Sequence, residues 1–225
     1  MSGDKPAVPR AAATRLARDM IGAYASGWFA MDADPGGRMA WRTVERRAII
    51  QPSEHGIARA RRSFKADRWT FDVRADEDFD EVLRLCALPR GNSEWLTGRL
   101  RDAYRVLRDM GFGHCFTVYD LSGRIVGGTL VVTIAGVSFA ESTFHRAPDA
   151  GNAAILGLIE ALFAEGCRLI DLQYLGNDHF RRFDAIEISQ QRYLELLRVA
   201  LEPPEPRAVH VPRRGRAATA SSPGT

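Results

Sequence analysis

The sequence has few cysteines and no long apolar run. Its three cysteines, Cys86, Cys115 and Cys167, stand far apart among 225 residues. This spacing excludes a disulfide scaffold and fits reduced thiols better than a zinc site. Apolar runs such as residues 127–135 are too short to span a bilayer, and the first fifteen residues contain no apolar segment typical of a signal peptide. We therefore expect a cytoplasmic protein with no membrane partner.

Several motifs of catalysis and ligand binding are also missing. The chain has no GxSxG, CxxC, HExxH or GxxxxGKS/T motif, and its five histidines lack metal-like spacing. One glycine, Gly151, stands in the turn APDAGNAA before the helix expected at 153–165. A pyrophosphate site for acyl-CoA favours a glycine-rich turn at that place. The turn therefore weakens an acyl-CoA interpretation without excluding it.

The charged residues are unevenly distributed. The 31 basic and 28 acidic residues leave a net charge of +3, which by itself does not indicate a nucleic-acid-binding protein. Residues 42–68, however, contain eight basic and three acidic residues, whereas residues 72–81 contain six acidic residues and one arginine. The basic block is either a solvated surface or a contact for nucleic acid.

Hydrophobic periodicity predicts an α+β fold with a mixed central sheet. Helices are expected over residues 14–25, 79–87, 94–110, 153–165 and 190–201, and strands over 48–52, 69–73, 114–119, 124–135, 137–142 and 168–173. A three-stranded meander, then a helix that crosses to a further strand, is similar to a GNAT-type acyltransferase domain. We expect a small N-terminal domain over 1–54 with residues 1–13 flexible, a GNAT-like catalytic domain over 55–201 and a disordered tail over 202–225.

Polar residues interrupt two of the apolar strands. Glu141 directly follows the strand GVSFA, and Asp171 and Gln173 alternate with apolar residues in LIDLQ. Because side chains two positions apart in a strand share a face, Asp171 and Gln173 are expected side by side. A carboxylate there is costly unless it is paired or faces a cleft. The pattern therefore indicates either a satisfied buried acid or part of a functional site.

These segments carry a family resemblance. The motifs are LARDMIGAYASGWF, the region around Trp41, EHGIARARRS, CALPR, EWLTGRLRDAYRVLRDMGFGH, IVGG, FAESTF and LIDLQYLGNDH. In their order and spacing, over roughly residues 16–198, the chain resembles the leucyl/phenylalanyl-tRNA–protein transferases. The resemblance implies transfer of Leu or Phe from aminoacyl-tRNA to the α-amino group of proteins that begin with Lys or Arg, which marks them for N-degron degradation. The aminoacyl ester is already activated, so we expect no cofactor and no metal. We also expect a monomer.

The resemblance also implies roles for single residues. Asp171 would accept a proton or orient the reactants, Gln173 would position the amine, and Glu141 would attract the cationic acceptor residue. The pocket for the aminoacyl group and adenosine would be formed by Trp41, Trp95, Tyr104, Thr129, Ser138, Thr143, Ile155, Leu158, Leu162 and Ile170. The phosphates of the acceptor stem would contact Arg42, Arg46, Arg47, Arg59, Arg61, Arg62 and Lys65.

Departures from the family's pattern concentrate around this pocket. Thr129 and Thr143 replace apolar or methionine residues, and Ser138 replaces an aromatic one, which adds polarity to the wall. The family's FPP and LAxGGDL segments are missing. The residues therefore support the reaction class more strongly than Leu or Phe as the donor. Two alternatives stay open: a GNAT-type N-acyltransferase that uses acyl-CoA, and a non-catalytic paralogue that binds tRNA or a protein N-terminus.

Overall fold

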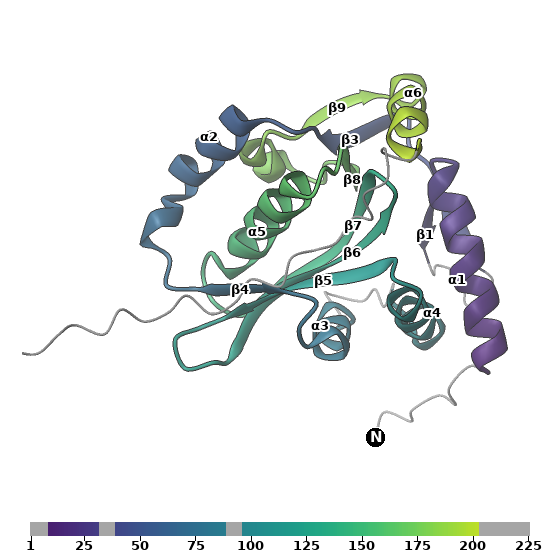
Figure 1. Cartoon of the computed structure of the whole chain (residues 1–225), viewed down its shortest axis with the longest axis horizontal. Coiled ribbons are helices and arrows are strands. Elements are labelled where there is room, and N and C mark those ends of the chain that lie inside the picture. The colour runs from purple at the N-terminus through teal and green to yellow at the C-terminus, as the bar shows by residue number, and fades with distance from the viewer. Residues whose placement is uncertain (1–8, 32–38, 89–95, 203–225) are drawn as a thin grey trace, which may run out of the picture.

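A seven-stranded mixed sheet forms the centre of the computed structural model, which describes residues 9–31, 39–88 and 96–202 (Figure 1). The strand order is β4-β5-β6-β7-β8-β3-β9. The strands are β3 (Arg46–Ile50), β4 (Asp72–Ala75), β5 (Gly113–Tyr119), β6 (Ile125–Ile134), β7 (Val137–His145), β8 (Leu169–Gln173) and β9 (Ile186–Ser189). A separate two-stranded sheet pairs β1 (Phe29–Met31) with β2 (Ala40–Arg42).

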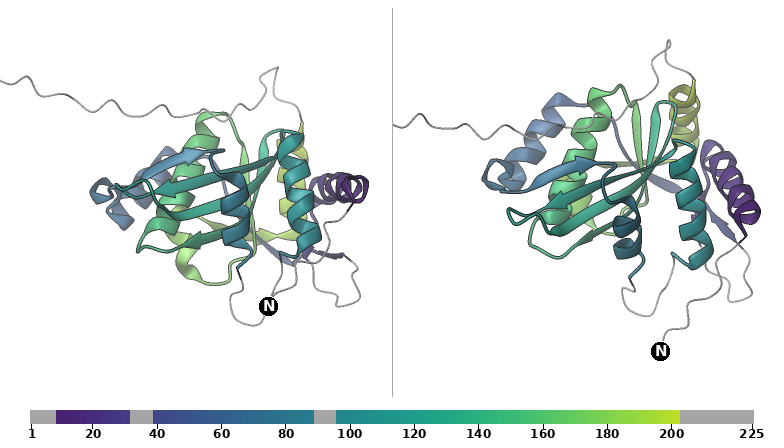
Figure 2. Two further views of the ribbon diagram at one scale, coloured as in Figure 1. Left: turned by 90° about the horizontal axis from the view of Figure 1, so that it is seen from below. Right: turned by 60° about the horizontal axis from the view of Figure 1, so that its bottom comes forward.

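Helices cover both faces of the large sheet. They are α1 (Arg10–Ala25), α2 (Glu54–Phe64), α3 (Phe79–Cys86), α4 (Gly98–Asp109), α5 (Ala150–Ala164) and α6 (Gln190–Leu201), with short 3₁₀ helices η1 (Ala66–Arg68) and η2 (Asp178–Phe183). Figure 2 shows α5 on one face and α3 and α4 on the other. Two main apolar clusters follow this division, one containing Leu100 and Leu107 of α4 and the other Leu158 and Leu162 of α5. None of the helices in the described ranges is long and apolar enough to cross a membrane.

The central topology confirms the predicted α+β fold. Strands β5, β6 and β7 form an antiparallel meander, and α5 then crosses over to β8, which pairs parallel to β7. Strands β5, β6 and β8 are buried along most of their length, and so are most of the apolar residues of α5. Their continuous apolar runs were sufficient to predict these elements, because helices cover both faces of the sheet.

Several expected boundaries and elements were wrong. Strand β3 pairs between β8 and β9, so residues 46–50 belong to the large sheet although they precede the expected boundary at residue 54. The division into two domains stays a prediction. Helix α1 begins at Arg10, so residues 10–13 are helical rather than flexible. The strand expected at 69–73 is displaced to β4, and α4 begins at Gly98 rather than at 94. Most of the expected disordered tail lies outside the described residues.

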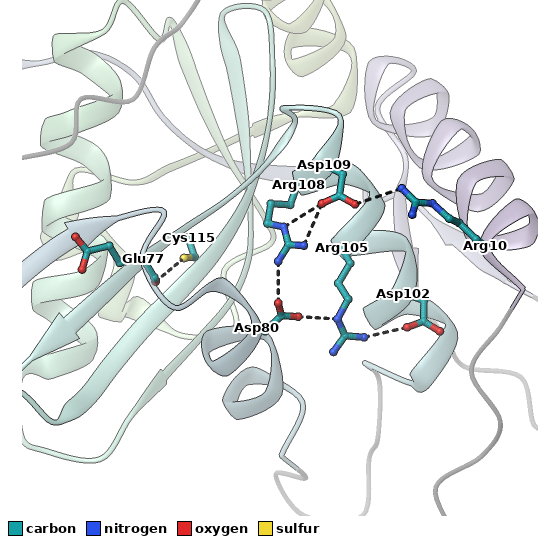
Figure 3. Close-up of polar contacts among 8 residues, drawn as sticks. All are labelled: Arg10, Glu77, Asp80, Asp102, Arg105, Arg108, Asp109 and Cys115. Carbon is teal, nitrogen blue, oxygen red and sulfur yellow. Dashed lines mark hydrogen bonds and ion pairs between the residues drawn. The ribbon is translucent and has the colours of Figure 1, made fainter.

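Charged side chains connect the helices on the face opposite α5 (Figure 3). Asp80 of α3 accepts hydrogen bonds from Arg105 (2.6 Å) and Arg108 (2.8 Å) of α4. Arg10 of α1 lies 3.9 Å from Asp109 of α4. Solvent-exposed pairs contribute only ~0–1 kcal/mol each. The network therefore orients three helices whose main attachment is the shared apolar cluster beneath it.

Candidate active site

A pocket lies where the parallel strands β7 and β8 separate. Their pairing ends at Phe139 opposite Asp171. The pocket has a volume of about 430 Å³. Its lining is mainly apolar and consists of Met31, Ile50, Thr129, Ala140, Glu141, Ser142, Thr143, Ile155, Leu158, Ile159, Ile170, Leu172, Gln173, Tyr174, Gly176 and Phe180. Among the residues of this lining, Glu141 alone carries a carboxyl group, and the side-chain amide of Gln173 lies beside it.

A β-bulge places Glu141 in the pocket. Leu130 of β6 pairs with Ser142 of β7, whereas the next residue, Val131, pairs with Ala140. Glu141 is therefore the extra residue of the bulge and has no partner in the ladder. Bulges bend a strand and redirect a side chain, and they occur often beside active sites. This local register shift explains how a carboxylate follows an apolar strand directly and still faces a cavity.

The two carboxylate oxygens of Glu141 have different surroundings. Oε2 accepts hydrogen bonds from Tyr104 Oη (2.8 Å) and Gln173 Nε2 (3.3 Å), and Tyr104 Oη lies 3.3 Å from Tyr24 Oη. Oε1 is buried and has no hydrogen-bond partner among the described residues. The pKa of Glu141 is raised to about 7, chiefly by burial and also by the charge of Asp171, whereas contacts with the two tyrosines and Gln173 act to lower it.

Asp171 is sealed behind this pocket. Its side chain is fully buried and forms a forked ion pair with Arg47, with Nε 2.9 Å from Oδ1 and Nη2 2.6 Å from Oδ2. Tyr193 Oη donates to Oδ2 at 2.6 Å, and the backbone N–H of Gln173 donates to Oδ1 at 2.7 Å. The guanidinium of Arg47 also lies over the rings of Phe29 and Tyr193. Asp171 is thus a satisfied buried acid with both oxygens occupied.

Gln173 connects the sealed acid to the pocket. It is the last residue of β8 and has a φ of +67°, which lies in the left-handed region that non-glycine residues rarely adopt. Such a conformation costs on the order of 1–3 kcal/mol and persists only where surrounding contacts enforce it. The contacts here are the backbone bond to Asp171 and the side-chain bond to Glu141. The turn therefore orients the Gln173 amide beside the Glu141 carboxylate.

Comparison with known proteins decides the family. The profile of the family described as leucyl/phenylalanyl-tRNA protein transferase matches residues 49–198. The chain belongs to this family. It is 32% identical to the leucyl/phenylalanyl-tRNA–protein transferase of Psychrobacter cryohalolentis, over 81% of the chain and 70% of that relative. It is 36% identical to that of Rhodopseudomonas palustris strain HaA2, over 81% and 82%. A solved structure, that of L-PGS from Bacillus licheniformis, matches 81% of the chain and 70% of its own length with 11% identity and a TM-score of 0.47.

The pocket of this transferase-family chain brings together many of the predicted site residues. They are Thr129, Glu141, Thr143, Ile155, Leu158, Ile170 and Gln173. Tyr104 does not line the pocket, but its hydroxyl reaches Glu141 from α4. Trp41 is half-buried on β2 and packs against the core outside the pocket lining. Trp95 lies outside the described residues.

Three further predicted site residues lie outside the pocket lining. Ser138 is fully buried and shares a 2.9 Å hydrogen bond with Thr133, so it lies in the sheet interior. Leu162 is fully buried, one turn beyond Leu158 in α5, and belongs to the apolar core. Asp171 is absent from the lining because its carboxylate is enclosed by Arg47 and Tyr193. In each case the sequence pattern indicated the face of the strand or helix on which the residue lies, but it did not show how deeply the side chain is buried.

One of the predicted phosphate contacts was also wrong. Arg47 is fully buried against Asp171 and cannot reach a phosphate on the surface. The side chains of Arg42, Arg46, Arg59, Arg62 and Lys65 are exposed, and Arg61 is half-buried. Arg59 pairs with Asp184, and Arg61 pairs with Asp67 and Glu160. Arg62 and Lys65 form no ion pair with any residue that the structure describes.

Sequence reasoning missed other residues of the site. Tyr174 lines the pocket, is half exposed and lies with its ring centroid 6.4 Å from that of Phe29. Phe180 of η2 closes another side. Tyr174 directly follows Gln173 in the chain, so adjacency alone could have identified it. No local signal marked Arg47 as the partner of Asp171. No group of three or more His, Cys, Asp or Glu side chains suited to a metal ion occurs in the described ranges.

Proposed function

We propose that this protein transfers an aminoacyl group from aminoacyl-tRNA to the N-terminal α-amino group of a protein that begins with Arg or Lys. The observation that carries the proposal is the meeting of Glu141 and Gln173 on one apolar pocket in a member of this transferase family. The proposal includes a cytoplasmic, monomeric enzyme that needs no cofactor. Its product would enter N-degron degradation.

The residues of the pocket suit this reaction. An aminoacyl ester is activated, so the enzyme has to hold the amine against the ester carbonyl and remove a proton. Glu141 offers a carboxylate, and Gln173 offers an amide that would position the amine beside it. The sequence left two roles open for Asp171, proton acceptor or orienting group. Both of its oxygens are occupied, and its hydrogen bonds hold Arg47 and the backbone of Gln173 in place, so Asp171 fits the orienting role.

The apolar walls would hold the donor side chain. Ile155, Leu158 and Ile170 provide surface for a side chain such as that of Leu or Phe. The Thr143 hydroxyl donates to Thr129 Oγ1 (2.9 Å), which donates to the carbonyl of Ser142 (3.1 Å). Because both hydroxyl hydrogens are already donated within the protein, the two threonines make the pocket wall less polar than their residue type suggests. This supports an apolar donor.

A basic surface beside the pocket would contact the tRNA. The exposed side chains of Arg59, Arg62 and Lys65 lie on or at the end of α2. Phe64 of this helix packs against Phe183 of η2 with ring centroids 4.5 Å apart, and Phe180 of η2 lines the pocket. Helix α2 is therefore separated from the pocket only by η2. At this distance its basic side chains would contact phosphates of the acceptor end of the tRNA.

No observation favours the acyl-CoA alternative. The residue before α5 is Asp149, whose carboxylate opposes an anionic pyrophosphate at that helix N-terminus. A non-catalytic paralogue would bind tRNA without transferring its amino acid.

The decisive experiment is a transfer assay. The protein is incubated with tRNA charged with labelled Leu, Phe or a mixture of amino acids and with a peptide that begins with Arg. We expect labelled peptide from an apolar donor and none when the peptide N-terminus is acetylated. Gln173→Ala should lower kcat, whereas Gln191→Ala, at an exposed position of α6, serves as the matched control. Absence of label from every charged tRNA contradicts the proposal.

A further inference from the structure

Glu141 carries one buried oxygen that nothing in the described structure satisfies. Oε2 is anchored by the Tyr104 hydroxyl and the Gln173 amide, whereas Oε1 is buried without a hydrogen-bond partner. Buried polar atoms are nearly always paired in native proteins, so an unpaired one requires a reason. Glu141 also lines the pocket as a bulge residue. Oε1 is thus the position at which a hydrogen-bond donor from a substrate would complete the site.

The neighbouring carboxylate cannot serve in the same way. Asp171 accepts hydrogen bonds from Arg47, Tyr193 and the backbone of Gln173. A substrate group could reach the oxygens of Asp171 only by displacing one of these donors, and displacing Arg47 would leave a buried charge without its partner, which is strongly unfavourable. Its side chain is also enclosed in the core. The two carboxylates therefore have separate tasks, because only Glu141 lines the pocket and has an oxygen without a hydrogen-bond partner among the described residues.

We propose that Glu141 Oε1 is the catalytic group that accepts the proton of the attacking α-amino group, and that Tyr104 is a positioning residue that holds Oε2. The inference rests on the proposed function. The nitrogen of the neutral amine attacks the ester carbonyl and forms the C–N bond. Its proton passes to Oε1, the bond between the carbonyl carbon and the ribose oxygen breaks, and that oxygen takes the proton from Glu141. An ester and an amine become an amide and an alcohol, and the carboxylate is restored.

The charges around Glu141 suit a proton acceptor at neutral pH. Tyr24 of α1 and Tyr104 of α4 face it, as does Asp171 of β8, whose charge is opposed by Arg47 of β3. On α3, the Cys86 thiol lies 3.5 Å from the carbonyl oxygen of Ser142, the residue after Glu141. Burial raises the pKa of Glu141 to about 7. A base works best when its pKa lies near the working pH, and an α-amino group has a pKa of about 8.

The test is the pH dependence of transfer between pH 5.5 and 8.5 at saturating acceptor peptide, with the charged tRNA that is active in the transfer assay. For the wild type we expect kcat to rise with pH as Glu141 loses its proton, through an apparent pKa above the usual range of a glutamate. Glu141→Gln should lower kcat by about 10²–10⁴-fold and lose this rise, and Glu141→Asp should restore part of the rate. Tyr104→Phe should move the rise to higher pH, because the Tyr104 hydrogen bond lowers the pKa of Glu141.

A matched control is Glu195→Gln, which removes an exposed carboxylate that pairs with Arg192 on α6 and should leave the profile unchanged. Glu141→Gln with an unchanged kcat and only a raised KM for the peptide would show that Glu141 binds the cationic acceptor, and would overturn the inference. A Tyr104→Phe profile that coincides with that of the wild type would overturn the positioning role. A wild type that transfers nothing at any pH overturns the proposed function itself, so the failures are distinct.

A second readout is independent of turnover. A carboxyl whose pKa is raised by folding keeps its proton longer in the folded state, so its contribution to stability falls as pH rises from about 4.5 to about 7. Urea unfolding should therefore show the wild type losing stability over this window relative to Glu141→Gln. Parallel curves for the two proteins would contradict the buried, proton-binding carboxyl on which the inference depends.

Discussion

At the scale of single residues, the chain separates two acids that look alike in the sequence. Glu141 and Asp171 both interrupt apolar strands, but Asp171 meets Arg47 across 124 residues of chain inside the core. Asp171→Asn is expected to lower stability as well as turnover, because the substitution leaves Arg47 charged, buried and without its counter-charge. Effects on activity at Asp171 must therefore be read together with the loss of fold.

We expect Arg47→Met to lower the free energy of unfolding by ~3–5 kcal/mol, because Asp171 then remains buried without its partner. Denaturant unfolding followed by circular dichroism measures this. The double variant Arg47→Met, Asp171→Leu should lose less than the sum of the single variants, since neither charge is left alone. Arg192→Met, which removes an exposed pair with Glu195, should change stability by only ~0–1 kcal/mol. Equal losses for Arg47→Met and Arg192→Met would rule out the buried-pair interpretation.

At the scale of elements, the position of α5 on the sheet shapes the pocket. This helix supplies Ile155, Leu158 and Ile159 to the lining. It starts against β6 at Gly127, where an added Cβ would lie 2.8 Å from the carbonyl oxygen of Ala150 and 2.9 Å from its carbon. Backbone atoms cannot rotate away as a side chain can, so any side chain at this position pushes the start of α5 off the sheet.

Gly127→Ala should therefore lower stability by about 1–3 kcal/mol through overpacking and raise the KM for aminoacyl-tRNA. Gly22→Ala is the matched control, because a Cβ there meets nothing within 4 Å and lies inside α1. That variant should gain up to ~1 kcal/mol of helix stability with unchanged kinetics. Thermal unfolding and transfer kinetics of both variants decide the matter. A harmless Gly127→Ala would mean that the start of α5 adjusts to the added methyl group without cost.

Helix α2 and strand β9 are among the elements that escaped prediction. Helix α2 has the apolar residues Ile57, Ala60 and Phe64 at helical spacing and packs them against the core, but it is short and most of its other residues are charged or polar. Ser53 Oγ caps it by accepting a hydrogen bond from the N–H of Gly56. Strand β9 is an edge strand in which Ile186 and Ile188 alternate with polar residues, but it has only four residues and its side chains are partly exposed. In both elements the pattern is present but short.

At the scale of the whole molecule, a net charge of +3 conceals an uneven distribution of acidic and basic residues. Most of the acids of residues 72–81 pair with arginines of β4, α3 or α4, for example Asp72 with Arg74, Glu81 with Arg84 and Asp80 with Arg105. On α2 and directly after it, Arg62 and Lys65 have no such partner in the described part of the chain. The basic block is therefore only partly neutralised, and its open cations lie on or directly after a helix that packs against η2.

Replacing these open cations should weaken tRNA binding in a salt-dependent way. For Arg62→Gln and Lys65→Gln together, we expect a lower affinity and a shallower slope of log K against log salt, by roughly 0.7–0.9 for each phosphate that the variant no longer neutralises. Filter binding or fluorescence anisotropy from low to moderate salt measures the slope. Arg124→Gln, at an exposed position of the β5–β6 turn where Arg124 pairs with Asp120, is the control. An unchanged slope would exclude these residues from the tRNA interface.

The sequence by itself determined the α+β meander, the crossover helix, the family and the three polar residues around which the site is built. Periodicity and motif order are local properties, so they could be read without a structure. Only the tertiary structure decided which acid faces the pocket. Glu141 turns inward because of a register shift against β6, and Asp171 is sealed by Arg47 from β3. Both outcomes depend on pairings between distant segments, which leave no mark on the spacing of residues along either strand.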